Sequence, residues 1–211
     1  MTIGQFVRVI GVVAAACTPA AAQQIESKPK ADGMIPATYR SYIVFDQRTD
    51  AKSPQNRTGK LHDLVTENNL NPVVAVFATK LPTGADDPVA KLVKRLKDVH
   101  AAHRADEFGA FVIFAALDRD YVADAKADAA AEAVQAWAGS VQPGGVAVGL
   151  TKKPDGKEGD ALTWGLAPDT TTVIVYNRMK QVKRWDLPAD GLTDAAIDAV
   201  VAEANGMLKK K

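Results

Sequence analysis

Two apolar runs constrain the fold of this chain more than any other feature. Val73–Phe77 and Phe111–Leu117 are apolar at every position and rich in β-branched and aromatic residues. Such runs are typical of central strands that are covered on both faces of a largely parallel sheet. Between them, apolar residues recur at helical spacing and predict an amphipathic helix. Asp86 or Asp87 can cap that helix, with Pro88 in its first turn.

The remaining elements follow the same alternation of strand and helix. We predict the strand 42–45, a short helix 61–67, an Ala-rich helix 124–138, the strand 146–150, a hairpin of strands 170–176 and 181–185 around Asn177–Lys180, and a last helix capped by Thr193. Alternating β and α units imply parallel strands with helices on both faces. We therefore expect an α/β fold, a central mixed sheet closed by a β-hairpin and a C-terminal helix.

The N-terminus is typical of a secretory signal. Arg8 precedes the short apolar run Val9–Ala16, and Ala20-Ala21-Ala22 offers small residues for cleavage before Gln23. The run is too short to cross a bilayer, and no other stretch is long and apolar enough to do so. We therefore expect export to the periplasm or the medium.

This interpretation divides the chain into three parts. We predict a signal peptide at 1–22, a flexible polar leader at 23–40 and one domain at 41–211. In an alternative, Ala14-Ala15-Ala16-Cys17 resembles a bacterial lipoprotein signal, and Cys17 carries the lipid.

Charge excludes one class of partner. Arg8 is the only charged residue of the first 22, so the remainder carries 25 basic and 25 acidic side chains. A net charge of zero gives no electrostatic attraction to nucleic acid or to an anionic membrane.

A family resemblance begins at the end of the first apolar run. The strand ends in Phe77-Ala78-Thr79 and is followed by Lys80-Leu81-Pro82-Thr83-Gly84. This run resembles exported or membrane-anchored bacterial redoxins of the thioredoxin-like superfamily. In these proteins a strand ending in a Phe-x-Ala-Thr-type run leads into a Trp-Cys-Pro-x-Cys loop and a helix. Gly59-Lys60, Asp63-Leu64 and the late hairpin are also similar, so the resemblance spans Tyr42 to Leu208 and implies a thioredoxin-like fold.

The chain departs from this family at the reactive positions. Lys80 stands for the usual Trp, and Leu81 and Gly84 stand where the two cysteines would be. Disulfide exchange needs a thiolate, and the only cysteine of the chain is Cys17, inside the predicted signal. We therefore predict no thiol-disulfide oxidoreductase or peroxidase activity, no catalytic residue, and no cofactor.

The same loop is the predicted binding site. Lys80, Leu81, Pro82 and Gly84 form its degenerate redox loop, and Pro168 is the nearest candidate for the cis-proline that the family places beside it. The peptide bond between Ala167 and Pro168 is either cis or trans. Leu81 either faces solvent as a contact for an extended peptide or turns inward to fill the space of the lost disulfide.

Other candidate residues carry weaker signals. His100 and His103 share a helix face, but a zinc site needs more ligands, and His62 is far away in sequence; we predict no metal site. Trp164 is a candidate partner anchor. Asn56-Arg57-Thr58 is a glycosylation sequon.

Three functions are compatible with these features. The first is a non-catalytic exported module that binds a protein or peptide of the cell envelope. The second is an enzyme on the same scaffold that uses histidine or metal chemistry. The third is a structural envelope component.

Overall fold

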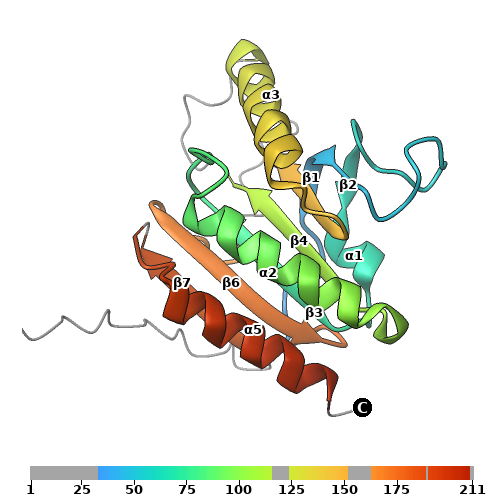
Figure 1. The fold of residues 1–211 in the computed structure, drawn as a ribbon, viewed down its shortest axis with the longest axis vertical. Coiled ribbons are helices and arrows are strands. Elements are labelled where there is room, and N and C mark those ends of the chain that lie inside the picture. Colours follow the sequence, from blue (N-terminus) through green and yellow to red (C-terminus); the bar gives the residue numbers. More distant parts are fainter. Residues whose placement is uncertain (1–32, 116–123, 152–162, 189, 210–211) are drawn as a thin grey trace, which may run out of the picture.

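The structure, a computed structural model, describes residues 33–115, 124–151, 163–188 and 190–209 (Figure 1). The predicted signal, residues 116–117 of the predicted second strand and residues 152–162, after the predicted strand 146–150, lie outside these residues. The elements in chain order are β1 Arg40–Phe45, β2 Leu61–Asp63, α1 Leu64–Asn68, β3 Val73–Ala78, α2 Pro88–Ala102, a 3-10 turn η1 Arg104–Asp106, β4 Gly109–Phe114, α3 Asp124–Val141, β5 Val146–Leu150, β6 Thr170–Asn177, β7 Lys180–Pro188 and α5 Asp194–Leu208.

The strands form one mixed sheet of seven, in the order β2-β1-β5-β4-β3-β6-β7. β3, β4 and β5 run parallel, whereas β1 and β6 join this group antiparallel. Every residue of β3 and β4 is buried, as the two apolar runs predict. The predicted mixed sheet with a closing hairpin is therefore confirmed.

Two apolar cores lie on the two faces of this sheet. On one face, α2, α3 and α5 pack together over the strands, with α2 beside α5 (Figure 1). The other face carries an aromatic cluster of Tyr39, Phe77, Phe111 and Trp164. Tyr39 comes from the segment before β1 and Trp164 from the loop 163–166, and α1 packs on the same face. Helices thus cover both faces, as predicted.

The region 61–67 differs from the predicted short helix. Its first residues form β2, which pairs antiparallel with β1 through Arg40 and Asp63. The helix α1 begins only at Leu64, because the Asp63 carboxylate accepts hydrogen bonds from the N–H groups of Val65 and Thr66. Pairing with a distant strand therefore decides the first three positions.

The described part of the predicted flexible leader packs on the domain. Ile35 and Tyr39 are buried, and the Ile35 N–H donates to the Met179 carbonyl at 2.9 Å. These apolar side chains occupy the second core, so the folded domain includes residues before the predicted start at 41. Apolar residues in a short polar segment gave too little pattern to predict this.

The helix and hairpin ends mostly follow the prediction. Of the two candidate caps, Asp87 is the residue that caps α2, and Thr193 caps α5. The hairpin turns at Arg178 and Met179, whose φ angles of 52° and 62° are those of a type I′ turn. The helix α3 extends three residues beyond Ala138, to Val141.

Among the described residues, no helix has the length and hydropathy needed to cross a bilayer.

Candidate functional site

The predicted redox-loop position lies where β3 ends, at the carboxyl end of the parallel strands. Thr79 fixes the loop to the start of β6: its N–H and its hydroxyl both contact the Thr170 carbonyl, at 3.1 and 2.9 Å. The Thr170 N–H in turn donates to the Thr79 hydroxyl oxygen at 2.9 Å. In open α/β sheets, ligands bind at this end of the strands.

A single carboxylate organises the remainder of the loop. Asp87 accepts a hydrogen bond from the Ala90 N–H at 2.7 Å, and so caps α2. Its other oxygen accepts from the N–H groups of Thr83 and Gly84, at 3.1 and 3.4 Å. Because this carboxylate and Pro88 occupy the first turn, the positive end of the helix dipole is compensated from within the chain.

A shallow pocket of about 120 Å³ opens beside this loop. Its walls come from the loop, the start of α2, the ends of β3 and β4, the start of β6 and the turn before α5. The lining is mainly apolar and hydroxyl-bearing, and includes Leu81, Pro82, Val89, Leu192 and Thr171. Such a pocket has room for one apolar side chain and offers hydroxyl and backbone groups around it.

The predicted site residues meet this pocket unequally. Lys80, Leu81 and Pro82 line it, whereas Gly84 and Pro168 do not. Leu81 is 36% exposed, so it does not fill the core. Lys80 forms an ion pair with Asp169 at 3.2 Å, with both side chains largely in solvent.

Gly84 and Pro168 take other positions. The Gly84 carbonyl accepts a hydrogen bond from the Trp137 indole at 3.0 Å, which anchors the loop to α3. The described residues contain no cis peptide bond, so of the two alternatives for Pro168 the structure has the trans form. Pro168 is exposed, and its neighbour Asp169 lines the pocket instead.

The structure also rejects Trp164 as an exposed anchor. The side chain is fully buried, and its indole N–H donates to the Thr38 carbonyl at 2.8 Å. Arg184 donates to the carbonyls of Trp164 and Gly165 and so holds this loop on β7. An indole placed between a loop and the sheet stabilises packing and is not available to a partner.

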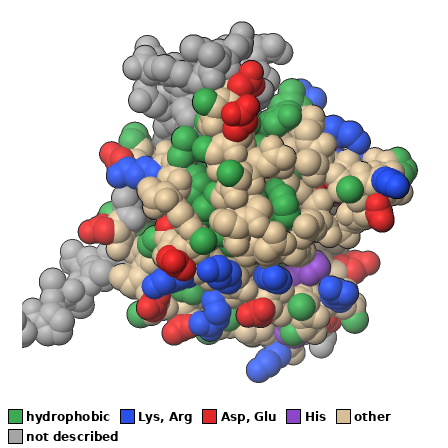
Figure 2. All heavy atoms as spheres, turned by 45° about the horizontal axis from the view of Figure 1, so that its top comes forward, with side chains coloured by type: hydrophobic (Ala, Val, Ile, Leu, Met, Phe, Trp, Pro, Cys, Tyr) green, Lys and Arg blue, Asp and Glu red, His purple; other side chains and the backbone are tan. Residues whose placement is uncertain are grey.

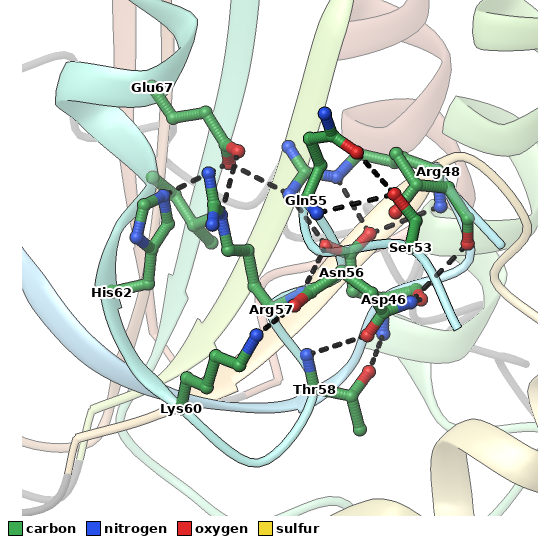
Figure 3. Close-up of polar contacts among 12 residues, drawn as sticks. Asp46, Arg48, Ser53, Gln55, Asn56, Arg57, Thr58, Lys60, His62 and Glu67 are labelled. Carbon is green, nitrogen blue, oxygen red and sulfur yellow. Dashed lines mark hydrogen bonds and ion pairs between the residues drawn. The ribbon is translucent and has the colours of Figure 1, made fainter. Parts of the chain in front are cut away.

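A second polar cluster, which the sequence analysis missed, lies in the loop 46–60 (Figure 3). Asp46 and Arg48 form a bidentate ion pair with contacts of 2.9 and 2.8 Å. Arg48 and Arg57 both reach Glu67 of α1, at 2.8 and 3.3 Å. The side chain of Asp46 is only 1% exposed, so this network is a structural fastening of the loop.

Charge and burial shift the pKa values of Asp46 and Arg48 in opposite directions. Burial by itself would raise the pKa of the Asp46 carboxyl. The hydrogen bonds and the charge of Arg48, together with the backbone N–H groups of Arg48 and Arg57, outweigh burial and hold the pKa below its usual value. At Arg48, the hydrogen bonds and charges of Asp46 and Glu67 likewise outweigh burial and raise the pKa of the guanidinium. Both groups are therefore charged in the folded protein.

The three histidines occupy separate places. His62 faces Glu67 at 3.4 Å, and His103 contacts Asp106 at 2.9 Å just beyond the end of α2. His100 is half-buried, and its ring packs so closely on Gly145 that an added Cβ there would lie 2.1 Å from Nδ1. None of them lines the pocket, and the described residues hold no cluster of three possible metal ligands.

The side chain of Asn56, the first residue of the sequon, is buried and held by hydrogen bonds. Asn56 is 7% exposed, and its side-chain amide donates to the carbonyls of Asp46 and Thr49, at 2.9 and 3.3 Å. Folding therefore removes the amide nitrogen from reach of a modifying enzyme.

The charged surface beside the pocket is mixed in sign. Figure 2 shows basic and acidic side chains interspersed on the face it presents. On α2, Lys91 and Arg95 pair with acidic residues of α5, Asp194 and Asp198, both at 3.0 Å. These pairs join the two helices and leave no surface of a single sign there.

Comparison with known proteins places this architecture in a known class. No family model matches the chain, and no curated protein matches its sequence. Solved structures do match. A candidate protein disulfide isomerase from Bacteroides thetaiotaomicron is 18% identical, with a TM-score of 0.54, over 88% of this chain and 92% of that one.

Two further matches are proteins of Mycobacterium tuberculosis. AhpC is 12% identical, with a TM-score of 0.53 and coverage of 84% and 92%. The peroxidoxin BcpB is 14% identical, with a TM-score of 0.51 and coverage of 82% and 94%. At these identities the match concerns the fold alone. The chain has a thioredoxin-like fold, as its loop and hairpin motifs indicated, and its only cysteine is Cys17.

Proposed function

We propose that this protein is an exported, non-catalytic thioredoxin-like module that binds an extended segment of a protein or peptide at the loop 79–84. The observation that carries the proposal is the exposed Leu81 beside Pro82, at the rim of a pocket in the place of the redox cysteines. The pocket is too small for most cofactors and large enough for one aliphatic side chain.

The surroundings of Leu81 support a peptide as the ligand. Thr79 and Thr170 rigidly join the loop to β6, so the rim is preformed and little ordering entropy is lost on binding. Lys80 and Asp169 stand beside it in solvent with opposite charges. A segment with one apolar side chain and polar neighbours matches this arrangement.

The non-catalytic part of the proposal rests on the missing thiol. Removal of residues 1–22 leaves a chain without cysteine. The protein purified after export should therefore not reduce an insulin disulfide or consume peroxide with a thiol donor. Turnover by such a preparation would contradict this part, and N-terminal sequencing tests cleavage before Gln23.

Leu81→Asp tests the binding surface, with Leu70→Asp as the matched control. Leu70 is 57% exposed and lies just after α1, away from the pocket. Both variants should unfold within about 1 kcal/mol of the wild type, because neither leucine is buried. Only Leu81→Asp should lose the partners that the wild type captures from its native envelope. Equal capture by both variants would reject this loop as the binding surface.

A further inference from the structure

The pocket beside the loop 79–84 has a floor that the register of the sheet defines. Ala78 is paired with Phe114 of β4 on one side and with Thr171 of β6 on the other. Directly paired residues of neighbouring strands project from the same face of a sheet, so these three side chains form one row. All three line the pocket. Because Ala78 is much smaller than its two neighbours, a ligand side chain can enter at the centre of this row.

Most polar side chains of the pocket are already bonded within the chain. The Thr79 hydroxyl contacts the backbone of Thr170, whose own hydroxyl donates to a carbonyl of the preceding loop at 2.6 Å. Asp87 accepts hydrogen bonds from three backbone N–H groups. Lys80 pairs with Asp169. These five side chains are therefore satisfied before a ligand binds.

Thr171 is the exception at the floor of the pocket. The residue is 6% exposed, and its hydroxyl forms no hydrogen bond with any residue that the structure describes. This oxygen is also not among the described polar atoms that are shut off from solvent without a partner, so it is open to solvent in the pocket that Thr171 lines. Thr83, whose hydroxyl also has no such bond, is exposed at the rim.

The free hydroxyl restricts what the pocket can hold. A side chain that fills the pocket displaces the solvent that meets Thr171, and a purely aliphatic one leaves this buried hydroxyl unpaired, which is costly. A charged group would lose its hydration and gain a single hydroxyl in exchange. A neutral hydroxyl or carboxamide on a short apolar stem avoids both costs. The stem contacts apolar walls such as Phe114 and Leu192, and the tip exchanges a hydrogen bond with Thr171.

We propose that the pocket selects a side chain with a neutral hydrogen-bonding tip, such as threonine or glutamine, over an aliphatic side chain of the same shape. Thr171 is then the residue that determines specificity. The volume of about 120 Å³ is slightly below that of a cavity that takes one benzene ring, so the stem is short. This inference rests on the proposed function, because it concerns the side chain that a peptide bound at the loop 79–84 places in the pocket.

Peptides from a cysteine-free heptapeptide display library are the probe. The library is selected on the exported wild-type protein, and peptides that also bind Leu81→Asp are discarded. In a selected peptide, the position at which glycine weakens binding most is taken as the pocket side chain. Threonine is then compared with valine at that position, and glutamine with methionine, by fluorescence anisotropy. The members of each pair have nearly the same shape, so the comparison isolates the polar tip.

The wild type should bind the threonine and glutamine peptides about tenfold more tightly than their aliphatic counterparts. Thr171→Ser keeps the hydroxyl and should keep this preference, whereas Thr171→Val keeps the shape and should lose it. Thr172→Val is the matched control and should leave the preference unchanged. The Thr172 hydroxyl donates to Asp186 at 2.8 Å, projects from the other face of β6 and does not line the pocket.

Failure of this inference is distinguishable from failure of the proposed function. If the selected peptides require Leu81 but bind more tightly with valine or methionine, the inference is wrong and the proposed function stands. The same conclusion follows if Thr171→Val retains the wild-type preference. If no selected peptide distinguishes the wild type from Leu81→Asp, the proposed function and this inference both fail.

Discussion

Two loops of this domain contain charged residues and lie at opposite ends of the sheet, yet they differ in almost every physical respect. The loop 46–60 follows β1, which ends beside the amino end of β5, whereas the loop 79–87 follows β3 at the carboxyl end. In the first, the buried Asp46 is bonded to the half-buried Arg48. In the second, Lys80 pairs in solvent with Asp169, the residue before β6, next to an open pocket. Ionic contacts thus fasten one end of the sheet, and the rim that we propose as the binding surface, at the other end, is exposed and apolar.

The largest effect expected from this comparison concerns the ion pair of the buried Asp46. Arg48→Met leaves the Asp46 carboxylate buried without its partner, which costs about 3–5 kcal/mol of unfolding free energy. The same substitution at Lys80 removes an exposed pair and should cost less than about 1 kcal/mol. Urea unfolding of both variants measures the difference. Similar losses for the two would show that the loop 46–60 is not the fastened one.

A smaller effect is expected at the cap of α2. Asp87→Ala removes the acceptor of the Ala90, Thr83 and Gly84 N–H groups and should cost about 1 kcal/mol. Asp86→Ala is the control, because Asp86 makes only a 3.8 Å contact with Lys94 at the surface. Thermal or urea unfolding distinguishes the two. If Asp86→Ala costs as much as Asp87→Ala, the cap assignment is wrong.

The smallest effect is a dependence on pH at His100. Burial, with the charges of Arg104 and Arg48, lowers the pKa of His100 below its ordinary value of 6.5. The folded protein therefore binds this proton less readily than the unfolded chain, so the stability contribution is present above 6.5 and decreases as the pH falls below it. His100→Gln should flatten the stability profile in that window. An unchanged slope in the variant would contradict the shift.

The sequence predicted the elements whose signal is local and periodic. The strand Val73–Phe77, the helix beginning at Asp87 and the cap at Thr193 all follow from patterns within a few residues. β2 could not be predicted, because its three residues become a strand only by pairing with β1. The resemblance gave the thioredoxin-like fold, and the structure brings Lys80, Leu81 and Pro82 to the pocket.

The polar cluster was beyond sequence reasoning for a different reason. Charged residues in a loop are usually solvated, and nothing local links Arg48 to Glu67, 19 positions away. Trp164 shows the same limit in reverse: the sequence places it in a loop, but the aromatic cluster with Tyr39 and Phe77 buries it completely. Long-range packing decides the exposure of both side chains.

Site-specific photo-cross-linking tests the central claim that the loop 79–84 is the working surface. A benzophenone amino acid replaces Leu81 in one protein and Gln55, which is exposed in the loop 46–60, in another. Both proteins are irradiated in the native envelope. The account predicts a discrete covalent adduct with a partner from position 81 and none from position 55. An adduct from position 55 alone, or from neither, would contradict it.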